Sequence, residues 1–537
     1  MVFILQEKSL FPRCVSLISA RNGEKYGSFR ISVIYRIRMI RGNGVKDQGA
    51  GTLIRSRKKK GVRLIMRYAS PAIFLCLLLT CSLVLAGCTS SSGPAQDTPL
   101  PTDLPVPPKG TPLTLKAIIP YVDAAATYAH NVGKEKAIAE FNNPESVFNS
   151  GEAYIFAEGM DGTALAEPFE HEIVGTSLRN YTDIYGVPVG RNIVDTARSG
   201  KGLISYHYRN PAHNNSLETK VSYVVNIDGT YYVGAGYYEN LGTVFPSAGR
   251  KADQQDITRE ELVAFVEGAR DYSRTNGREQ ALAAFNNQSG PFVRQEMYII
   301  AYDSGERNLA HPNSPVIRNL SLEHYTDQDS VATIAGLSDI AQRGGGFAHT
   351  TQQIPANGTL IFAPKLHYVL PVDDTWWISA AILNPDYTQL RTGNLTGIRV
   401  RNETQEELFT LVDRAVRYAQ VNGKEKTLAE INKPDGMFAQ GNLFVWASGF
   451  DGTLLADPFL KDLTGTNQIE YTDAYGEKTT RAGISAVTNG TGYVHGMFAE
   501  TSTGSSIPVP KLMYMKAVDD TWSIGSGIYG VEVRKIA

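Results

Sequence analysis

Three lysines recur at one position of a sequence pattern that the chain carries three times. Lys220, Lys365 and Lys511 each open the pattern Lys-x-x-Tyr. A lysine ammonium can pair with the carboxylate of a small ligand, because it is a compact point charge with three donors. The alternative is a solvated lysine on the exposed face of a strand. The sequence leaves both interpretations open.

Tyrosines stand on the segment that precedes two of these lysines. Tyr206 and Tyr208 flank His207, and Tyr493 lies in the corresponding segment before Lys511. Because successive side chains of a strand point to opposite faces, Tyr206 and Tyr208 share one face and His207 points away. Tyrosine hydroxyls beside a lysine would form a cage for a small acid, whereas core packing is the alternative role. The expected ligand-binding residues are Lys220, Tyr206, Tyr208, Lys365, Lys511 and Tyr493.

Sequence patterns of catalysis and of metal binding are missing. The nine histidines form no His-Glu-x-x-His pair, and there is no Gly-x-Ser-x-Gly elbow or Walker loop. The four cysteines lie in the first 88 residues, which excludes a disulfide framework, thiolate metal sites and cysteine catalysis from the rest. We therefore expect a protein that is not an enzyme, with no catalytic residue, no metal site and no cofactor.

The elements that position these side chains belong to a unit repeated with spacings of 144 and 146 residues. Tyr-Thr-Asp, for example, ends at Asp183, Asp327 and Asp473. These aspartates could bind a cation, but the pattern is more typical of a turn. Each copy is long enough to form its own core. The expected domains are 115–245, 256–390 and 402–537.

Each copy opens with a helix and continues with strands. Thr258 and Thr404 begin capping boxes, and apolar residues at helical spacing follow both. In the first copy Pro120 predicts a delayed helix start. The remainder of each copy reads as strands, with Asp-Gly hairpin turns and aromatic closing strands at Tyr231–Tyr238 and Trp522–Tyr529. The expected fold is α+β, with N-terminal helices packed on one face of an antiparallel sheet.

The order of these motifs resembles the single Cache type of extracellular sensor domain, which has a PAS-like fold. The third copy is most similar, because it ends Asp519-Asp-Thr-Trp-Ser-Ile-Gly-Ser-Gly-Ile-Tyr529. The second copy departs, with Ser304-Gly-Glu306 in place of Asp-Gly-Thr and with no glycines in its closing segment. The resemblance implies three tandem PAS-like Cache domains that bind small ligands, often short organic acids, between the sheet and its covering loops.

The N-terminal part resembles a lipoprotein export signal. Residues 66–87 combine Arg67 with an apolar run of 14 residues, which is short for a membrane span, and their last three residues form Leu85-Ala-Gly-Cys88 with the cysteine that follows. We expect cleavage before Cys88 and lipid on its thiol; an uncleaved signal anchor is the alternative. Residues 1–65 are interpreted as a misassigned upstream start, or else as a basic cytoplasmic tail. Residues 88–114 are a Ser/Pro-rich tether.

Charge narrows the class of partner. The first 87 residues carry 16 Lys and Arg against 3 Asp and Glu, whereas the whole chain carries 52 against 54. The body is therefore acidic, which argues against nucleic acid. The expected protein is a lipid-anchored sensor or solute-binding protein on the extracytoplasmic face of a membrane. It would bind small organic acids or amino acids and pass the signal to a receptor or transporter partner. A non-enzymatic structural or adhesion protein with the copies as spacers is the alternative.

Overall fold

The computed structural model describes residues 17–20, 31–34, 113–150, 153–210, 214–238 and 256–535. The chain divides into two compact units, Met1–Ser91 and Ser92–Ala537. In the first unit, β1 (Leu17–Ala20) pairs antiparallel with β2 (Ile31–Ile34). Cys88 and the expected signal and tether, 66–114, lie outside the described residues except at 113 and 114. The three copies lie in the second unit.

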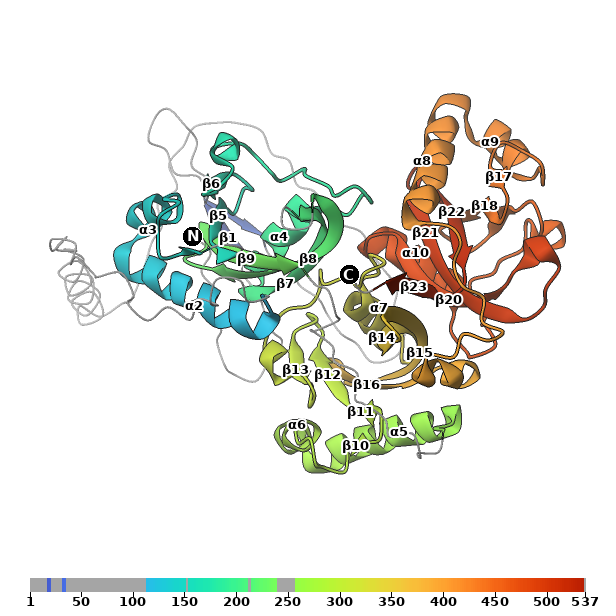
Figure 1. Cartoon of the computed structure of the whole chain (residues 1–537), viewed down its shortest axis with the longest axis horizontal. Helices are drawn as coiled ribbons and strands as arrows, with labels where there is room; N and C mark the ends of the chain where they lie inside the picture. The colour runs from blue at the N-terminus through green and yellow to red at the C-terminus, as the bar shows by residue number, and fades with distance from the viewer. Residues whose placement is uncertain are drawn as a thin grey trace, which may run out of the picture. The chain divides into compact units, whose positions relative to one another are not determined.

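The described parts of the three copies share one order of elements (Figure 1). The first copy contains α2 (Leu115–Val132), α3 (Lys134–Phe141), β3 (Asn149–Ser150), β4 (Ala153–Tyr154), β5 (Phe156–Gly159), β6 (Ala164–Ala166), η1 (His171–Ile173), α4 (Val189–Arg198), β7 (Lys201–Asn210), β8 (Ser216–Asn226) and β9 (Tyr231–Tyr238). The second contains α5 (Arg259–Asn276), α6 (Arg278–Phe285), β10 (Val293–Arg294), β11 (Met297–Tyr298), β12 (Ile300–Asp303), β13 (Asn308–Ala310), η3 (Pro315–Ile317), α7 (Thr333–Gln342), β14 (Gly346–Ala356), β15 (Thr359–Asp373), β16 (Trp376–Leu383) and η4 (Pro385–Thr392). The third contains α8 (Gln405–Asn422), α9 (Lys424–Ile431), β17 (Ala439–Gln440), β18 (Leu443–Gly449), β19 (Leu454–Ala456), η5 (Lys461–Leu463), α10 (Thr479–Asn489), β20 (Tyr493–Ala499), η6 (Thr501–Thr503), β21 (Pro508–Ala517), β22 (Trp522–Tyr529) and β23 (Glu532–Lys535).

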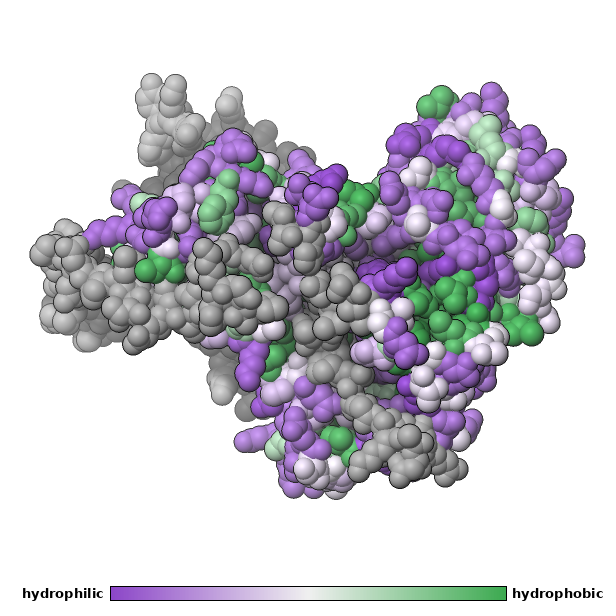
Figure 2. Space-filling view, in the orientation of Figure 1, coloured by the Kyte–Doolittle hydropathy of each residue, from purple (hydrophilic) through white to green (hydrophobic). Residues whose placement is uncertain are grey.

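Each copy is built on an antiparallel sheet whose closing strand lies at its centre. The strand orders are β6-β5-β9-β8-β7, β13-β12-β16-β15-β14 and β17-β18-β22-β21-β20, and β19 also pairs with β18. The long helices α2, α5 and α8 pack against the central strands of their own sheets. In Figure 2 the visible surface over α8 and α9 is mainly hydrophilic, as expected for helices that bury only one face. The predicted α+β fold of three tandem PAS-like domains is confirmed.

The helix starts follow the capping chemistry that the sequence predicts. The Thr258 and Thr404 hydroxyls accept from the backbone N–H groups of Glu261 and Glu407, and each glutamate accepts from the backbone N–H of its threonine. Both boxes are therefore complete and satisfy orphan donors of the first turn.

The expectation of a delayed start in the first copy is wrong. Helix α2 begins at Leu115 and contains Pro120, which is exposed. Proline removes one helical hydrogen bond at this point. Ile118, Tyr121 and Val122 are fully buried against the sheet, so tertiary packing outweighs the local cost.

The expectation that the remainder of each copy is only strands is also wrong. A short helix, α4, α7 or α10, precedes the third strand of each main sheet and packs on the sheet face opposite the long helix. In the first copy Val189, Ile193 and Ala197 of α4 bury against Ile204 and Val224. Each sheet is thus covered on both faces, and the second face is the one that carries the recurring lysines.

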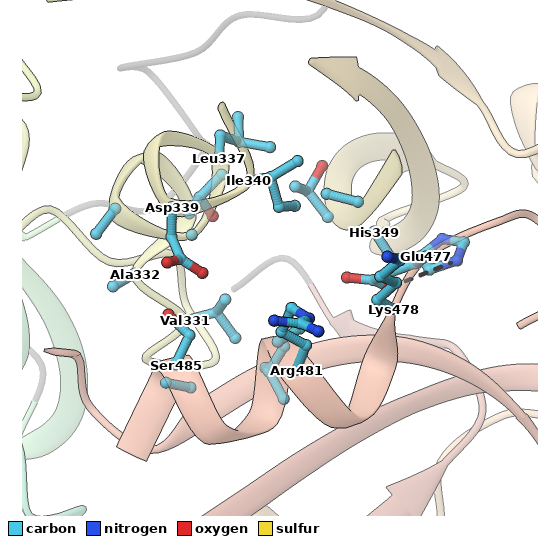
Figure 3. Close-up of a pocket in the computed structure, with 18 of the residues that line it drawn as sticks. Val331, Ala332, Leu337, Asp339, Ile340, His349, Glu477, Lys478, Arg481 and Ser485 are labelled. Carbon is cyan, nitrogen blue, oxygen red and sulfur yellow. Dashed lines mark ion pairs between the residues drawn. The ribbon is translucent and has the colours of Figure 1, made fainter. Parts of the chain in front are cut away.

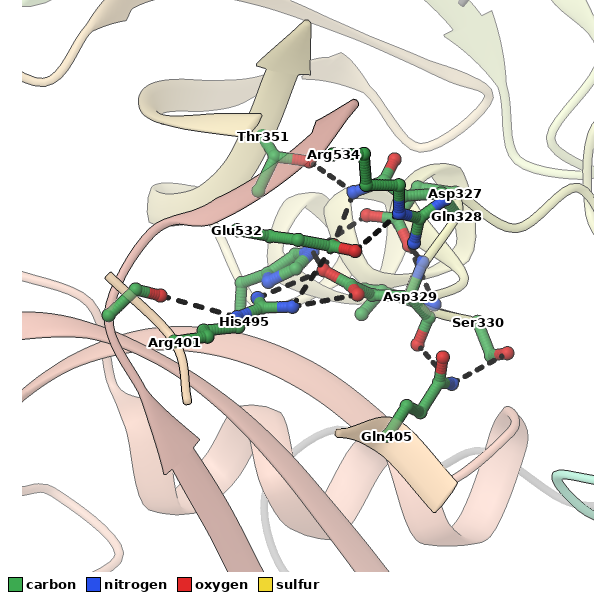
Figure 4. Close-up of polar contacts among 12 residues, drawn as sticks. Asp327, Gln328, Asp329, Ser330, Thr351, Arg401, Gln405, His495, Glu532 and Arg534 are labelled. Atoms are coloured by element: carbon green, nitrogen blue, oxygen red, sulfur yellow. Dashed lines mark hydrogen bonds and ion pairs between the residues drawn. The ribbon is translucent and has the colours of Figure 1, made fainter. Parts of the chain in front are cut away.

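The second and third copies meet through reciprocal histidine–aspartate pairs. His349 of β14 lies 2.6 Å from Asp473 of the third copy, measured from Nε2 to Oδ2. His495 of β20 lies 2.7 Å from Asp327 of the second copy in the same way. Arg401 adds two hydrogen bonds to Asp329, of 2.9 and 3.0 Å (Figure 4). This junction is therefore polar, buried and ordered by specific pairs.

The last strand crosses from one copy to another. β23 follows the closing strand of the third copy but pairs antiparallel with β15 of the second, from Thr359–Lys535 to Phe362–Glu532. The range 402–537, proposed for the third domain, therefore ends in a strand that extends the second sheet.

Candidate ligand-binding sites

The three lysines occupy one register position in the three sheets. Lys220 lies opposite Tyr206, Lys365 opposite Thr350 and Lys511 opposite Gly496 on the neighbouring strand. On their other side stand the closing strands, which present Tyr238, Leu383 and Tyr529. The repeat in sequence is thus a repeat in space.

The interpretation of these residues as solvated surface lysines is wrong. Lys220 is 6% exposed and Lys511 is 5% exposed, and Lys365 is partly buried. None of the three makes an ion pair with a carboxylate among the described residues. Removing an ammonium from water without a directly paired counter-ion is costly, so each lysine retains donors for an anionic ligand.

Tyrosine rings surround Lys220 in the first copy. Its Nζ donates to the Tyr154 hydroxyl at 3.4 Å and lies 5.1 Å from the ring centre of Tyr208 and 5.7 Å from that of Tyr238. Tyr206 is buried on the same face, and its hydroxyl shares a 3.1 Å hydrogen bond with Ser222. The prediction that Tyr206 and Tyr208 share the lysine face is confirmed; their contact with a ligand stays a prediction.

A second aromatic cage surrounds Lys511 in the third copy. Its Nζ donates to the Tyr529 hydroxyl at 3.0 Å. The ring centres of Tyr529, Trp446, Phe498 and Phe444 lie 4.4, 4.7, 5.2 and 5.4 Å from it. Aromatic faces attract a desolvated cation, so these rings offset part of the cost of burial.

Tyr493 is not part of this cage. It pairs in register with Tyr514 and stacks on it at 4.4 Å, within the core beneath α8. Lys511 pairs with Gly496, three residues along the strand, so the two side chains point to opposite faces. The predicted help of Tyr493 to Lys511 is therefore wrong.

Glycines in the closing strands make room for two of the lysines. A Cβ built on Gly236 would meet Lys220 Cε at 2.5 Å, and one on Gly527 would meet Lys511 Cε at 2.4 Å. At the same register position the second copy has Ala381. The closing strand of the second copy, which lacks these glycines, thus places an alanine methyl group beside Lys365.

Each copy has one further ionisable residue near its lysine that the sequence did not predict. Glu167, His311 and Asp457 are separated by the repeat spacings, and each backbone N–H donates to an asparagine side chain 25 residues earlier. Alignment of the copies on these spacings would have paired the three. The first and third copies therefore bring a carboxylate near the lysine, and the second brings a histidine.

The pKa values of these three residues depend on burial and on the charge of the neighbouring lysine. Burial raises the pKa of Glu167 to about 7, and the charge of Lys220 opposes that rise. Burial also raises the pKa of Asp457, and Lys511 opposes it. In the second copy burial and the charge of Lys365 lower the pKa of His311 to about 3.

Lys365 differs from the other two in facing a cavity. The cavity has a volume of about 1470 Å³, and its lining includes Tyr298, His311, Lys365 and His367. Burial lowers the pKa of Lys365 to about 8, so the ammonium is mostly charged at neutral pH. Burial and Lys365 hold the pKa of His367 well below its ordinary value. Close to Lys365 the cavity therefore offers one cation and two neutral imidazoles, and its wider lining includes charged residues of all three copies, among them Glu218, Arg401 and Glu532.

The recurring aspartates form turns, as expected. Asp183 Oδ1 accepts from the backbone N–H groups of Tyr185 and Val187 at 2.9 Å each. Asp327 and Asp473 repeat this arrangement with the residues two and four positions later. The second carboxylate oxygen stays available for the junction histidines in two of the three copies.

No helix among the described residues is both long and apolar enough to cross a membrane.

Comparison with known proteins places the repeats in a family. A profile of the single Cache domain 2 family matches residues 128–240, 263–383 and 378–537. No protein among those with curated functions matches the chain.

Solved structures are also similar to parts of the chain. A methyl-accepting chemotaxis protein from Vibrio parahaemolyticus RIMD 2210633 is 18% identical over 23% of this chain and 87% of its own, with a TM-score of 0.21. A Cache chemosensory domain, reported with the structural basis of its carboxylic acid recognition, is 21% identical over 19% and 69%, with a TM-score of 0.18. The ligand binding domain of Mlp24 with asparagine is 14% identical over 49% and 80%, with a TM-score of 0.15.

The profile matches fall on all three copies and together span more than half of the chain. They cover the three main sheets with their closing strands, most of α5 and all of α8. The chain belongs to the single Cache domain 2 family.

Proposed function

We propose that this protein is an extracytoplasmic sensor or solute-binding protein that recognises small carboxylate-bearing molecules. The observation that carries the proposal is the recurring lysine, which is wholly or partly buried and forms no direct ion pair with a carboxylate among the described residues. A ligand carboxylate supplies the missing counter-charge and gains charge-assisted hydrogen bonds.

The second copy is the best candidate for an anionic ligand. Lys365 lines a cavity of about 1470 Å³ together with His311 and His367. Both histidines are neutral at pH 7, because burial and Lys365 lower their pKa values. A neutral imidazole can still donate one hydrogen bond, so the site suits a small acid with one or two carboxylates.

The first and third copies suit a zwitterion instead. Each places a carboxylate, Glu167 or Asp457, near its lysine, and aromatic rings surround the ammonium. An amino acid needs a cation for its carboxylate and an anion for its ammonium. The lysine and the nearby acidic side chain supply this pair of charges. Lys511 stays the proposed ligand residue of the third copy.

The proposal is tested by titration of residues 92–537, which form one compact unit. A thermal-shift screen of small mono- and dicarboxylates and amino acids identifies a ligand, and calorimetry then compares Lys365→Met with the unaltered unit. Loss of one charge-assisted hydrogen bond costs about 1.5–3 kcal/mol, so the affinity for an acid should fall about 10- to 150-fold.

The chain offers a matched control in Lys516. This lysine is paired with Asp413 at 2.6 Å and its side chain is 41% exposed. Lys516→Met should leave acid binding unchanged. A folded Lys365→Met unit that binds acids with unchanged affinity would refute the role of this lysine. No binding of any acid or amino acid would favour the structural, spacer role of the copies.

The proposed location is the outer face of a membrane, through lipid on Cys88, with the signal passed to a partner protein. The support is the Leu85-Ala-Gly-Cys88 sequence after a short apolar run. Two lipid chains would anchor the protein stably, whereas one would not. Mass spectrometry of the protein extracted from membranes should find an N-terminal lipid-modified Cys88. A mature chain that still contains residues 66–87 would contradict the anchor.

A further inference from the structure

Three buried side chains with metal-binding atoms meet at the junction of the second and third copies. His349 comes from β14, and Asp473 and Glu477 come from the loop before α10. Their ligand atoms all lie within 4.8 Å of one another. His349 Nε2 is 2.6 Å from Asp473 Oδ2 and 3.7 Å from Glu477 Oε2, and the side chains are 1%, 1% and 3% exposed.

The charges of this cluster are not balanced by protein groups. Neither Asp473 nor Glu477 forms an ion pair with a lysine or arginine within the described part of the chain. The nearby Lys478 and Arg481 pair with Glu470 instead. Two buried carboxylates therefore share a single imidazole, an arrangement that is costly without a further cation.

Two atoms of the cluster also lack hydrogen bonds. Glu477 Oε2 and His349 Nδ1 are buried with no hydrogen-bond partner among the described residues. An unpartnered, almost fully buried carboxylate oxygen aimed at two other ligand atoms indicates a position for a bound cation.

A second cluster at the same junction, which we call the reciprocal cluster, contains His495, Asp327, Asp329 and Arg401. In this cluster a protein side chain supplies the cation that balances the buried carboxylates. There His495 pairs with Asp327, and Arg401 pairs bidentately with Asp329 (Figure 4). The position four residues after Asp327 is Val331, whereas the position four residues after Asp473 is Glu477. One cluster thus has an arginine and no carboxylate at that position, and the other has a glutamate there and no arginine.

We propose that the cluster of His349, Asp473 and Glu477 binds a divalent transition-metal ion, zinc in particular. Imidazole nitrogen and carboxylate oxygens are ligands that zinc accepts at about 2.0–2.2 Å. To bind one ion together, His349 Nε2 and Asp473 Oδ2 would have to move apart from their present 2.6 Å by less than about 1 Å. Three protein ligands leave the fourth position of a tetrahedral ion to water.

A cavity gives the ion a route to the site. It has a volume of about 410 Å³, and its lining includes His349 and Glu477 together with residues of α7 and α10 (Figure 3). Because the ligands come from two copies, the ion would tie β14 of the second copy to the third. Metal binding then stabilises the junction, and the stabilisation grows with the logarithm of the affinity.

Zinc itself is the probe in the test. Residues 92–537, freed of metal with a chelator, are titrated with zinc by calorimetry and melted with and without zinc. We expect one zinc per chain and a higher melting temperature. Glu477→Gln and His349→Gln should each lower zinc affinity at least about tenfold, because each removes one ligand. His495→Gln, in the reciprocal cluster, is the matched control and should leave zinc affinity unchanged.

Two results would overturn the proposal. One is no zinc binding by the unaltered unit, and the other is unchanged affinity in both Glu477→Gln and His349→Gln, which would assign the zinc to other histidines. X-ray absorption of the zinc-loaded unaltered protein decides the matter if a variant fails to fold. One imidazole among oxygen ligands supports the site, and two or more imidazoles contradict it.

Discussion

The aromatic residues around each recurring lysine stabilise an ammonium group that is removed from water. Burial of an unpaired charge costs several kcal/mol. At Lys511 four aromatic rings and one hydroxyl lie close to Nζ, and a desolvated cation gains about 2 kcal/mol from such a ring. These groups offset part of the cost of burying the ammonium. A ligand carboxylate is the group that completes the balance.

The glycine beside this lysine gives a prediction at the same scale. In Gly527→Ala the new Cβ would meet Lys511 Cε at 2.4 Å. Overpacking of this kind costs about 1–3 kcal/mol, and thermal unfolding of residues 92–537 measures it. In a Lys511→Ala background the clash with the stem is gone, so the same substitution should cost less.

The control for this prediction is Gly268→Ala on α5, where an added Cβ meets nothing within 4 Å. It should be neutral or stabilising by up to about 1 kcal/mol, because alanine is the better helix former. An equal cost of Gly527→Ala in both backgrounds would show that the lysine stem is not what the glycine accommodates.

The secondary-structure elements could be predicted where local chemistry decides them. Capping boxes at Thr258 and Thr404 set the starts of α5 and α8, and the aromatic closing strands have the predicted bounds. The helices on the second face were missed, although Val189, Ile193 and Ala197 of α4 have helical spacing. These helices have only 10 or 11 residues, and the sheet face that buries them is what stabilises them.

The candidate sites could be predicted only in part, because they too depend on tertiary packing that local sequence does not determine. Repeat spacing placed the lysines at one position, but burial depends on the covering helices and loops, which a strand pattern does not contain. The face of Tyr493 depends on register, and a shift of one residue between strands reverses the face. The junction pairs, such as His349 with Asp473, join residues 124 positions apart, so no local pattern indicates them.

At the scale of the whole molecule, the copies are more than three separate sensors. β23 pairs with the second sheet, and the junction histidines contact aspartates of the opposite copy. Thr350, the register partner of Lys365, directly follows His349, which contacts Asp473 of the third copy. A ligand that moves β14 would therefore act on the third copy as well.

The central claim is that a charged, buried lysine binds the carboxylate, and the pH dependence of acid affinity tests it most directly. Burial lowers the pKa of Lys365 to about 8, so the ammonium is present below that pH and lost above it. The carboxylate of the ligand stays ionised throughout this range.

Calorimetry of residues 92–537 with a bound acid, repeated between pH 7 and pH 9 at fixed salt, measures this dependence. The affinity should fall about tenfold as the pH rises across this range, because the charged fraction of Lys365 falls by that factor. Lys365→Met should bind weakly and show no such fall. An acid affinity that is the same at pH 7 and pH 9 in the unaltered unit would contradict the account.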